Sequence, residues 1–144
     1  MCTRTIKKEI FLMKKGWICG IIAVVLNLLL GLFLNWACGF LAGTGDPEFA
    51  QTAVLGAYLA KFYFGLTVVN ALVLFWASKK KVGSVFLIIA GVFSFMSGVG
   101  IVAAILNIVS ATSFNNARKL AKLEAQHQAE LDAAVAAQAD VTVE

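Results

Sequence analysis

The feature that most constrains this chain is a series of long apolar runs, the first extending from Gly16 to Gly43 without a charged residue. About 20 apolar residues suffice for a helix to cross the hydrocarbon core of a bilayer. Because lipid offers the backbone no hydrogen bonds, only helices and closed barrels can span it. Of the 144 residues, 14% are charged, whereas a soluble domain has roughly 25%. The sequence predicts an all-α membrane protein, built as a small transmembrane helix bundle.

The borders of the apolar runs divide the chain into three parts. Residues 1–15 form a basic amphipathic segment and residues 16–114 form the bundle. Residues 115–144 form an alanine-rich, charged cytoplasmic tail, which we expect to be helical to about residue 138. A start at Met13 is as natural as one at Met1, so the true first residue stays open. Within the bundle, the expected spans lie at about 17–43, 47–78, 82–97 and 99–114.

The loop between the first two spans carries the signals of a helix start. Asp46 is a good N-cap, and Pro47 suits the first helical position. Glu48 in the first turn is favoured by the helix dipole. We therefore expect the second helix to begin near Pro47.

The last apolar run, from Val82 to about Phe114, leaves two arrangements open. It is too long for one comfortable span, and two spans of about 15–16 residues fall below the usual length of about 17–25. The sequence Ser97-Gly98-Val99-Gly100 at its middle favours a break. Basic residues follow the run as well as precede it, which favours a hairpin. Four spans are therefore expected, with three as the alternative.

Basic residues flank the runs on one side only. Lys14 and Lys15 precede the first span and Lys79–Lys81 follow the second, whereas the loop between them is acidic. By the positive-inside rule, the amino terminus and the lysine turn are cytoplasmic. We expect a plasma-membrane protein whose carboxy terminus is also cytoplasmic if there are four spans.

Aromatic residues mark the expected membrane interfaces, where tryptophan and tyrosine are enriched. One ionisable residue, Lys61, stands near them, and its stem can reach the outer interface by snorkelling. A functional intramembrane role is the alternative for this lysine. The expected anchors are Trp17, Trp36, Tyr58, Lys61, Tyr63 and Trp76.

Small and polar residues recur at helical spacing within the runs. Small residues let helices approach closely in lipid, and buried amides bond across helices. A polar groove for a solute, or a hydrated pathway, would use the same residue types. We expect structural packing, carried by Gly20, Asn27, Gly31, Asn35, Asn70, Gly91, Gly98 and Asn107.

Signals for chemistry are missing from this sequence. The three cysteines form no C-x-x-C pair, and the one histidine, His127, has no neighbouring ligand residues. No phosphate-binding glycine motif follows a strand. We expect no enzymatic activity, no catalytic residue, no metal site and no cofactor, and the basic clusters indicate membrane orientation rather than nucleic-acid binding.

The glycine-rich ending LIIAGVFSF…GVGIVAAILNIVS, at residues 87–95 and 98–110, resembles small bacterial multi-pass membrane proteins of unknown function. These proteins also have a basic amino terminus and a glycine-rich first span. The resemblance implies a four-helix membrane protein and transfers no functional residue.

Two functions remain open at this stage. The first is a scaffold or an accessory or regulatory membrane subunit, with the tail as its cytoplasmic contact. The second is a small holin-like pore-forming protein. Expected partners are the lipid bilayer, with anionic lipids at the basic amino terminus, and either a second copy of the chain or another membrane protein.

Overall fold

The chain folds into four helices and is all-α, as predicted. The computed structural model describes residues 2–45, 47–96 and 100–141. In chain order the helices are α1 (Cys2–Gly43), α2 (Pro47–Lys79), α3 (Lys81–Met96) and α4 (Ile101–Val141).

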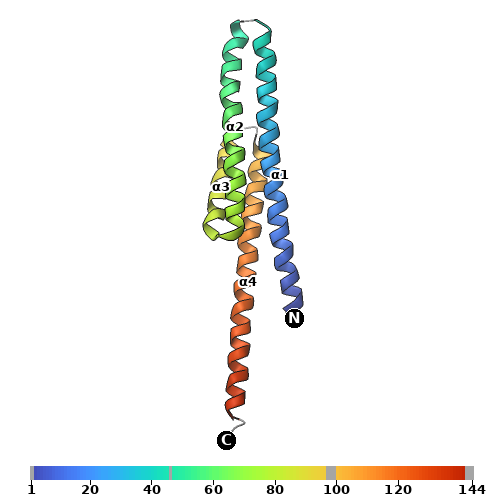
Figure 1. Ribbon diagram of the computed structural model, residues 1–144, viewed down its shortest axis with the longest axis vertical. Coiled ribbons are helices and arrows are strands. Elements are labelled where there is room, and N and C mark those ends of the chain that lie inside the picture. The colour runs from blue at the N-terminus through green and yellow to red at the C-terminus, as the bar shows by residue number, and fades with distance from the viewer. Residues whose placement is uncertain (1, 46, 97–99, 142–144) are drawn as a thin grey trace.

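The helices form two antiparallel hairpins that pack side by side (Figure 1). Helix α1 contacts α2 and α4, and α3 contacts the same two helices, so α1 and α3 lie diagonally opposite each other. The α1–α2 hairpin continues well beyond the end of the shorter α3–α4 hairpin. At the opposite end α4 extends alone (Figure 1). Four helices therefore surround one another only in the middle of an elongated molecule.

The connection from α1 to α2 has the expected local chemistry. Thr44 follows the last residue of α1, and its Oγ1 donates to the Leu41 carbonyl at 2.7 Å. Gly45 has φ of 72°, a conformation that glycine adopts without steric cost. Helix α2 begins at Pro47 as predicted. The expected N-cap, Asp46, and the side chain of Glu48 lie outside the described residues.

The turn between α2 and α3 is very tight, because only Lys80 separates the two helices. Gly83, in the first turn of α3, lies against the backbone of Trp76 and Ala77. A side chain at this position would collide with that backbone. Gly83 therefore allows α3 to fold back closely on α2.

The apolar run at 82–114 forms two helices, which end and begin at Met96 and Ile101. Residues 97–99, including Gly98, lie outside the described residues. Residues 2–15 form one continuous helix with the first apolar run, and the tail continues from the last apolar segment as the end of α4. Neither junction holds a proline, and the glycine at the first, Gly16, is accommodated inside the helix, so the helices run on.

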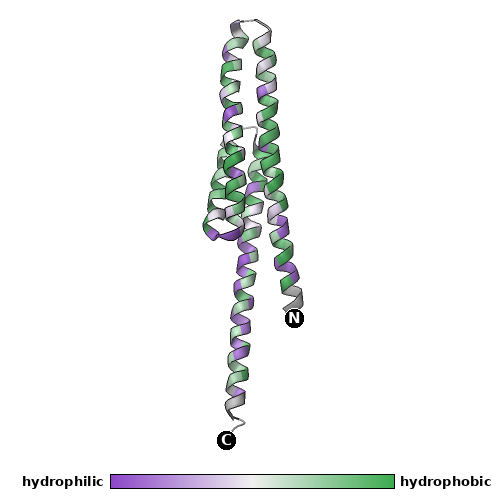
Figure 2. Ribbon diagram, viewed as in Figure 1, coloured by the Kyte–Doolittle hydropathy of each residue, from purple (hydrophilic) through white to green (hydrophobic). Residues whose placement is uncertain are grey.

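The distribution of side chains is the reverse of that in a water-soluble protein. The described buried residues are mostly alanine, serine, asparagine and glycine, with a few large side chains such as Tyr63, Leu74 and Phe114. Isoleucine, leucine, valine and phenylalanine cover the outside of the helices. Figure 2 shows this apolar surface over both hairpins, and polar residues at the α2–α3 turn and along the free end of α4.

Two helices are long and apolar enough to cross a membrane, over Ile6–Gly43 and Phe49–Lys79. Helix α3 is apolar but has only 16 residues, which corresponds to about 24 Å.

Candidate functional site

The interface between α1 and α2 is built on the glycines of α1. Gly20 lies against the side chain of Leu74, and Gly31 lies 3.4 Å from Tyr63 Cβ, measured from the position that a Cβ would take. Farther along, Gly56 of α2 lies against the Cys38 thiol. These three contacts give one antiparallel register, in which each turn of α1 faces a known turn of α2. Gly20 and Gly31 therefore lie in the close contact between α1 and α2.

The stripe of small and polar residues on α1 divides into two halves. Gly16, Gly20, Asn27 and Gly31 are buried inside the molecule. Asn35 is exposed, and beyond it Gly39 and Gly43 are also exposed with no atom near the position of a Cβ. The second half of the stripe therefore faces outward along the part of the hairpin that α3 and α4 do not cover.

Three asparagines lie in the interior, on three different helices. Asn27, Asn70 and Asn107 are each 0% exposed. Asn107 Nδ2 donates to Asn70 Oδ1 at 3.4 Å, which is a long hydrogen bond. Asn27 makes no hydrogen bond through either its side-chain nitrogen or its side-chain oxygen. Asn70 Nδ2 and Asn107 Oδ1 are also unpaired. An unpaired buried polar group lowers the stability of a fold by about 1–3 kcal/mol. The unpaired atoms of these three asparagines therefore destabilise the bundle.

Helix α3 closes the cluster on its fourth side through Gly91. A Cβ at this glycine would lie 3.3 Å from Asn107 Cβ and 3.2 Å from the Ala104 carbonyl oxygen. Gly91 therefore permits the close approach of α3 to α4 that its sequence position predicts. The other predicted packing glycine of this hairpin, Gly98, lies outside the described residues.

Arg118 joins the two hairpins at the end that carries the basic residues. Its guanidinium donates to the Ala77 carbonyl of α2, to Ser84 Oγ of α3 at 3.0 Å, and to Asn115 Oδ1 at 3.2 Å. The Ala77 carbonyl is one of the last of α2, where carbonyls lack a partner within the helix. Partial burial lowers the pKa of Arg118, but a guanidinium remains protonated in proteins.

A second contact between the hairpins is made by Ser110, about two turns before Arg118 along α4. Ser110 Oγ donates to the Gly16 carbonyl at 2.7 Å, and Phe114 packs on Gly16 and edge-on against Trp17. Phe114 and Trp17 belong to an apolar cluster with Leu74, Ala77, Leu87 and Ala111. This cluster fills the interior between the asparagines and the basic end of the molecule.

The predicted interface residues fall at two levels of the α1–α2 hairpin. Trp17 packs against the cluster that contains Ala77, so Trp76 is at its level, where it stacks on Phe86. The contact of Cys38 with Gly56 likewise brings Trp36 level with Tyr58. Trp17 and Trp36 are 19 positions apart, or about 28 Å along the helix. Two aromatic belts are thus separated by close to the thickness of a bilayer core.

Lys61 lies near the belt of Trp36 and Tyr58 and is exposed. Its Nζ lies 5.7 Å from the centroid of the Tyr58 ring, within the range of a cation–π interaction. Trp36, also exposed, stacks with Phe40. Tyr63, in contrast, is 1% exposed and packs against α1, so its ring belongs to the helix interface rather than to the surface.

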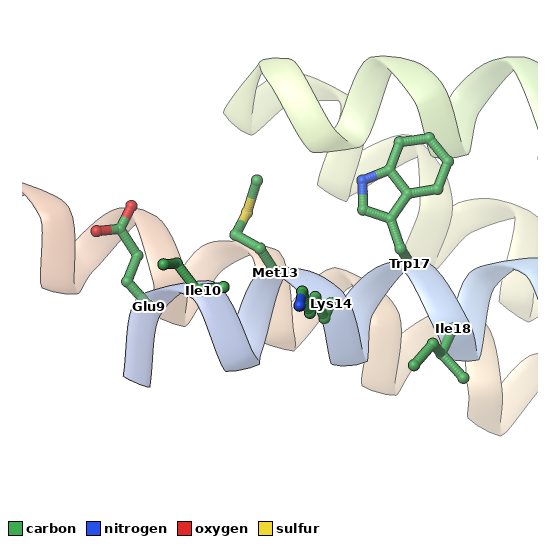
Figure 3. Close-up of a pocket in the computed structure, with 6 residues that line it drawn as sticks. All are labelled: Glu9, Ile10, Met13, Lys14, Trp17 and Ile18. Carbon is green, nitrogen blue, oxygen red and sulfur yellow. The ribbon is translucent and has the colours of Figure 1, made fainter. Parts of the chain in front are cut away.

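A shallow groove of about 420 Å³ lies on the amino-terminal part of α1. Met13 and Trp17 project from the same side of this helix (Figure 3). Because the described lining residues all belong to α1, no second wall among the described residues encloses a small molecule. The lining consists of Glu9, Ile10, Met13, Lys14, Trp17 and Ile18.

Within the described residues, no three histidine, cysteine, aspartate or glutamate side chains lie together as a metal site would require. Cys19 and Cys38 are free cysteines. The chemistry that the described interior offers is therefore that of amides, hydroxyls and small residues.

Sequence reasoning missed two residues that hold the hairpins together. The basic residues after the last apolar run, Arg118 among them, indicate only membrane orientation in the sequence. The position of Arg118, one turn beyond an apolar run and level with a helix end, is nevertheless one from which an arginine can reach free carbonyls. Ser110 carried no signal beyond its place in an apolar run.

Comparisons with known proteins add no relative: the chain matches no family, no curated protein and no solved structure.

Proposed function

We propose that this chain is a non-enzymatic multi-pass membrane protein that serves as a scaffold or as an accessory or regulatory subunit. The observation that carries the proposal is the reversed distribution of side chains, apolar outside and small or polar inside. In water, an exposed apolar surface of this extent would drive aggregation. In lipid the same surface is solvated, and helices associate through small residues and buried polar groups.

The two aromatic belts support a definite position in the bilayer. The hydrocarbon core would lie between the level of Trp17 and Trp76 and the level of Trp36 and Tyr58, because its thickness is about 30 Å. Helix α3 would begin at the inner belt and α4 would return to it, where Arg118 joins both helices to α2. With about 24 Å of helix, α3 would nearly reach the outer belt. This arrangement favours four crossings over three.

The basic residues support the orientation. Lys14 and Lys15 precede Trp17, Lys79–Lys81 form the α2–α3 turn, and Arg118 binds the end of α2. They therefore gather at one end of the molecule. By the positive-inside rule this end faces the cytoplasm, and α4 would extend from it as the cytoplasmic tail of a plasma-membrane protein.

Two surfaces favour a scaffolding role. The first is the outward half of the small-residue stripe, Asn35, Gly39 and Gly43, which lies beside the exposed ring of Trp36. The second is the free end of α4, which projects without a neighbouring helix (Figure 1). Most of the stability of helices in proteins comes from packing against neighbours, so a partner would stabilise it. A second copy of the chain or another membrane protein would fit the first surface.

The bilayer itself is the remaining proposed partner. The groove on α1 is lined by four apolar residues, by Glu9 and by Lys14, and Lys14 is at the level of the lysine turn. Anionic headgroups are attracted to basic residues at the inner surface by about 1 kcal/mol for each residue. Anionic lipid would therefore gather around this end of the molecule.

Crosslinking in intact membranes tests the scaffold. The proposal predicts a defined homo-oligomer or a defined partner band, which weakens in a Gly39→Leu variant or after deletion of residues 119–144. Gly65→Leu is the matched control, since Gly65 is also exposed and has open space around it. A chain that remains monomeric and without partners, with or without its tail, would contradict the proposal.

The buried amides favour a second candidate, a holin-like pore, because a hydrated pathway would use such residues. The apolar cluster of Leu74, Leu87 and Phe114 opposes it, since it fills the interior of one copy. A pore would then have to form between copies. Rapid loss of membrane potential on expression would support the pore, and an intact potential at high expression would reject it.

A further inference from the structure

The buried asparagine cluster leaves four polar atoms without a partner among the described residues. These atoms are Asn27 Nδ2, Asn27 Oδ1, Asn70 Nδ2 and Asn107 Oδ1. All three side chains are fully buried, so bulk solvent does not reach them. Buried amides without partners are rare in folded proteins, and such atoms ordinarily bind an ordered water or another ligand.

Asn27 and Asn70 lie at neighbouring levels of the α1–α2 interface. Asn70 and Asn107 are already joined by a hydrogen bond. The contacts of Gly20 with Leu74 and of Gly31 with Tyr63 give the register of α1 against α2. This register brings Asn27 level with Thr67, which is three residues, or about 4.5 Å along the axis, from Asn70. Asn27 and Asn70 therefore stand about one helical turn apart across the same interface.

The chemistry of the unpaired atoms restricts the ligand. Two of them are amide nitrogens, which donate, and two are amide oxygens, which accept. Exchanging the oxygen and nitrogen of Asn27, or of Asn70 and Asn107 together, leaves this balance unchanged. A cation would satisfy only the oxygens, and an anion only the nitrogens. A small neutral molecule that both donates and accepts satisfies both kinds of atom.

We infer that the interior of the bundle binds water at a site formed by Asn27, Asn70 and Asn107, which links α1, α2 and α4. Water has two donor and two acceptor positions, and buried waters typically make about three hydrogen bonds to such polar groups. The apolar cluster around Leu74 and Phe114 separates the site from the basic end, so the water is enclosed on that side. The inference concerns the folded bundle and does not depend on the proposed scaffold function.

Magnetic resonance of the full chain in lipid nanodiscs, labelled with ¹⁵N-asparagine, tests the site. The chain has six asparagines, and single substitutions assign their side-chain amides. A rotating-frame Overhauser transfer from water, whose sign separates close contact from proton exchange, is measured at each amide. The inference predicts transfer at Asn27 and Asn70 as well as at the exposed Asn35 and Asn116. Transfer confined to Asn35, Asn116 and other amides outside the interior would overturn it.

Two further measurements sharpen the outcome. Asn27→Leu should abolish or strongly weaken the transfer at Asn70, whereas the control Asn35→Leu should leave that transfer unchanged. Replacing sodium chloride by choline chloride should not move the Asn27 and Asn70 resonances. If these resonances shift with the cation, the site binds a metal ion and the inference is wrong. The Overhauser transfer in the wild type and the exchange of sodium for choline need no substitution in the cluster. These two measurements therefore decide the outcome even if Asn27→Leu fails to fold.

Discussion

The packing of α3 against α4 predicts opposite responses of two glycines to the same substitution. Gly91 faces α4, and a Cβ there would lie 3.2 Å from the Ala104 carbonyl oxygen and 3.3 Å from Asn107 Cβ. Neither a backbone oxygen nor the Cβ of a buried asparagine can rotate away. Gly65 of α2 is exposed, and nothing lies within 4 Å of the same position.

The size of the difference follows from two terms. Alanine is favoured over glycine inside a helix by about 0.8–1.0 kcal/mol, and this gain is common to both positions. Overpacking a filled interface costs about 1–3 kcal/mol, and only Gly91→Ala meets it. Subtracting the two variants cancels helix propensity. We therefore predict that Gly91→Ala has a free energy of unfolding about 1–3 kcal/mol lower than Gly65→Ala.

The assay is reversible unfolding of the purified protein in mixed micelles by titration with a denaturing detergent. Tryptophan fluorescence is a suitable signal, because Trp76 stacks on Phe86 with ring centroids 5.4 Å apart and this contact is lost on unfolding. Gly65→Ala should be as stable as the wild type or slightly more stable. Equal midpoints for the two variants, or a greater loss at Gly65, would refute the packing of α3 against α4.

The remaining predictions concern the end of the molecule that carries the basic residues. Arg118→Ala should lower the free energy of unfolding by about 2 kcal/mol, since hydrogen bonds to charged groups contribute about 1.5–3 kcal/mol. The control Lys119→Ala, on an exposed residue, should change the free energy of unfolding little. Equal losses for the two variants in the same titration would count against the link that Arg118 makes between the hairpins. Replacing Lys79–Lys81 by glutamine should produce a mixed topology in protease-protection experiments, because the positive charges that would keep this turn on the cytoplasmic side are removed. An unchanged topology would show that other charges set the orientation.

Local signals predicted the ends of the helices better than their extent. The start of α2 at Pro47 and the separation of α3 from α4 follow from proline and glycine chemistry that acts within a few residues. Helix α1 is continuous through Gly16, and α4 is continuous through Asn115. A change from apolar to charged residues marks a change of surroundings, and it does not by itself interrupt a helix.

The interior was predictable in kind but not in detail. Small residues and asparagines at helical spacing indicate close packing, and Gly20, Gly31 and Asn27 are buried as that pattern suggests. Asn35 continues the same stripe but is exposed, because the neighbouring hairpin ends before it. The burial of Tyr63 likewise depends on the register between α1 and α2, which is set by contacts between distant residues and leaves no mark in local periodicity.

The position of the carboxy terminus tests the topology most directly. Reporters that are active only in the cytoplasm or only outside it can be fused after the last residue and, for comparison, at Gly45 in the α1–α2 connection. We predict that the carboxy-terminal fusion reports the cytoplasm and that the fusion at Gly45 reports the opposite side. A carboxy terminus on the same side as Gly45 would mean an odd number of crossings, and it would contradict the pairing of α3 and α4 as a hairpin in the membrane.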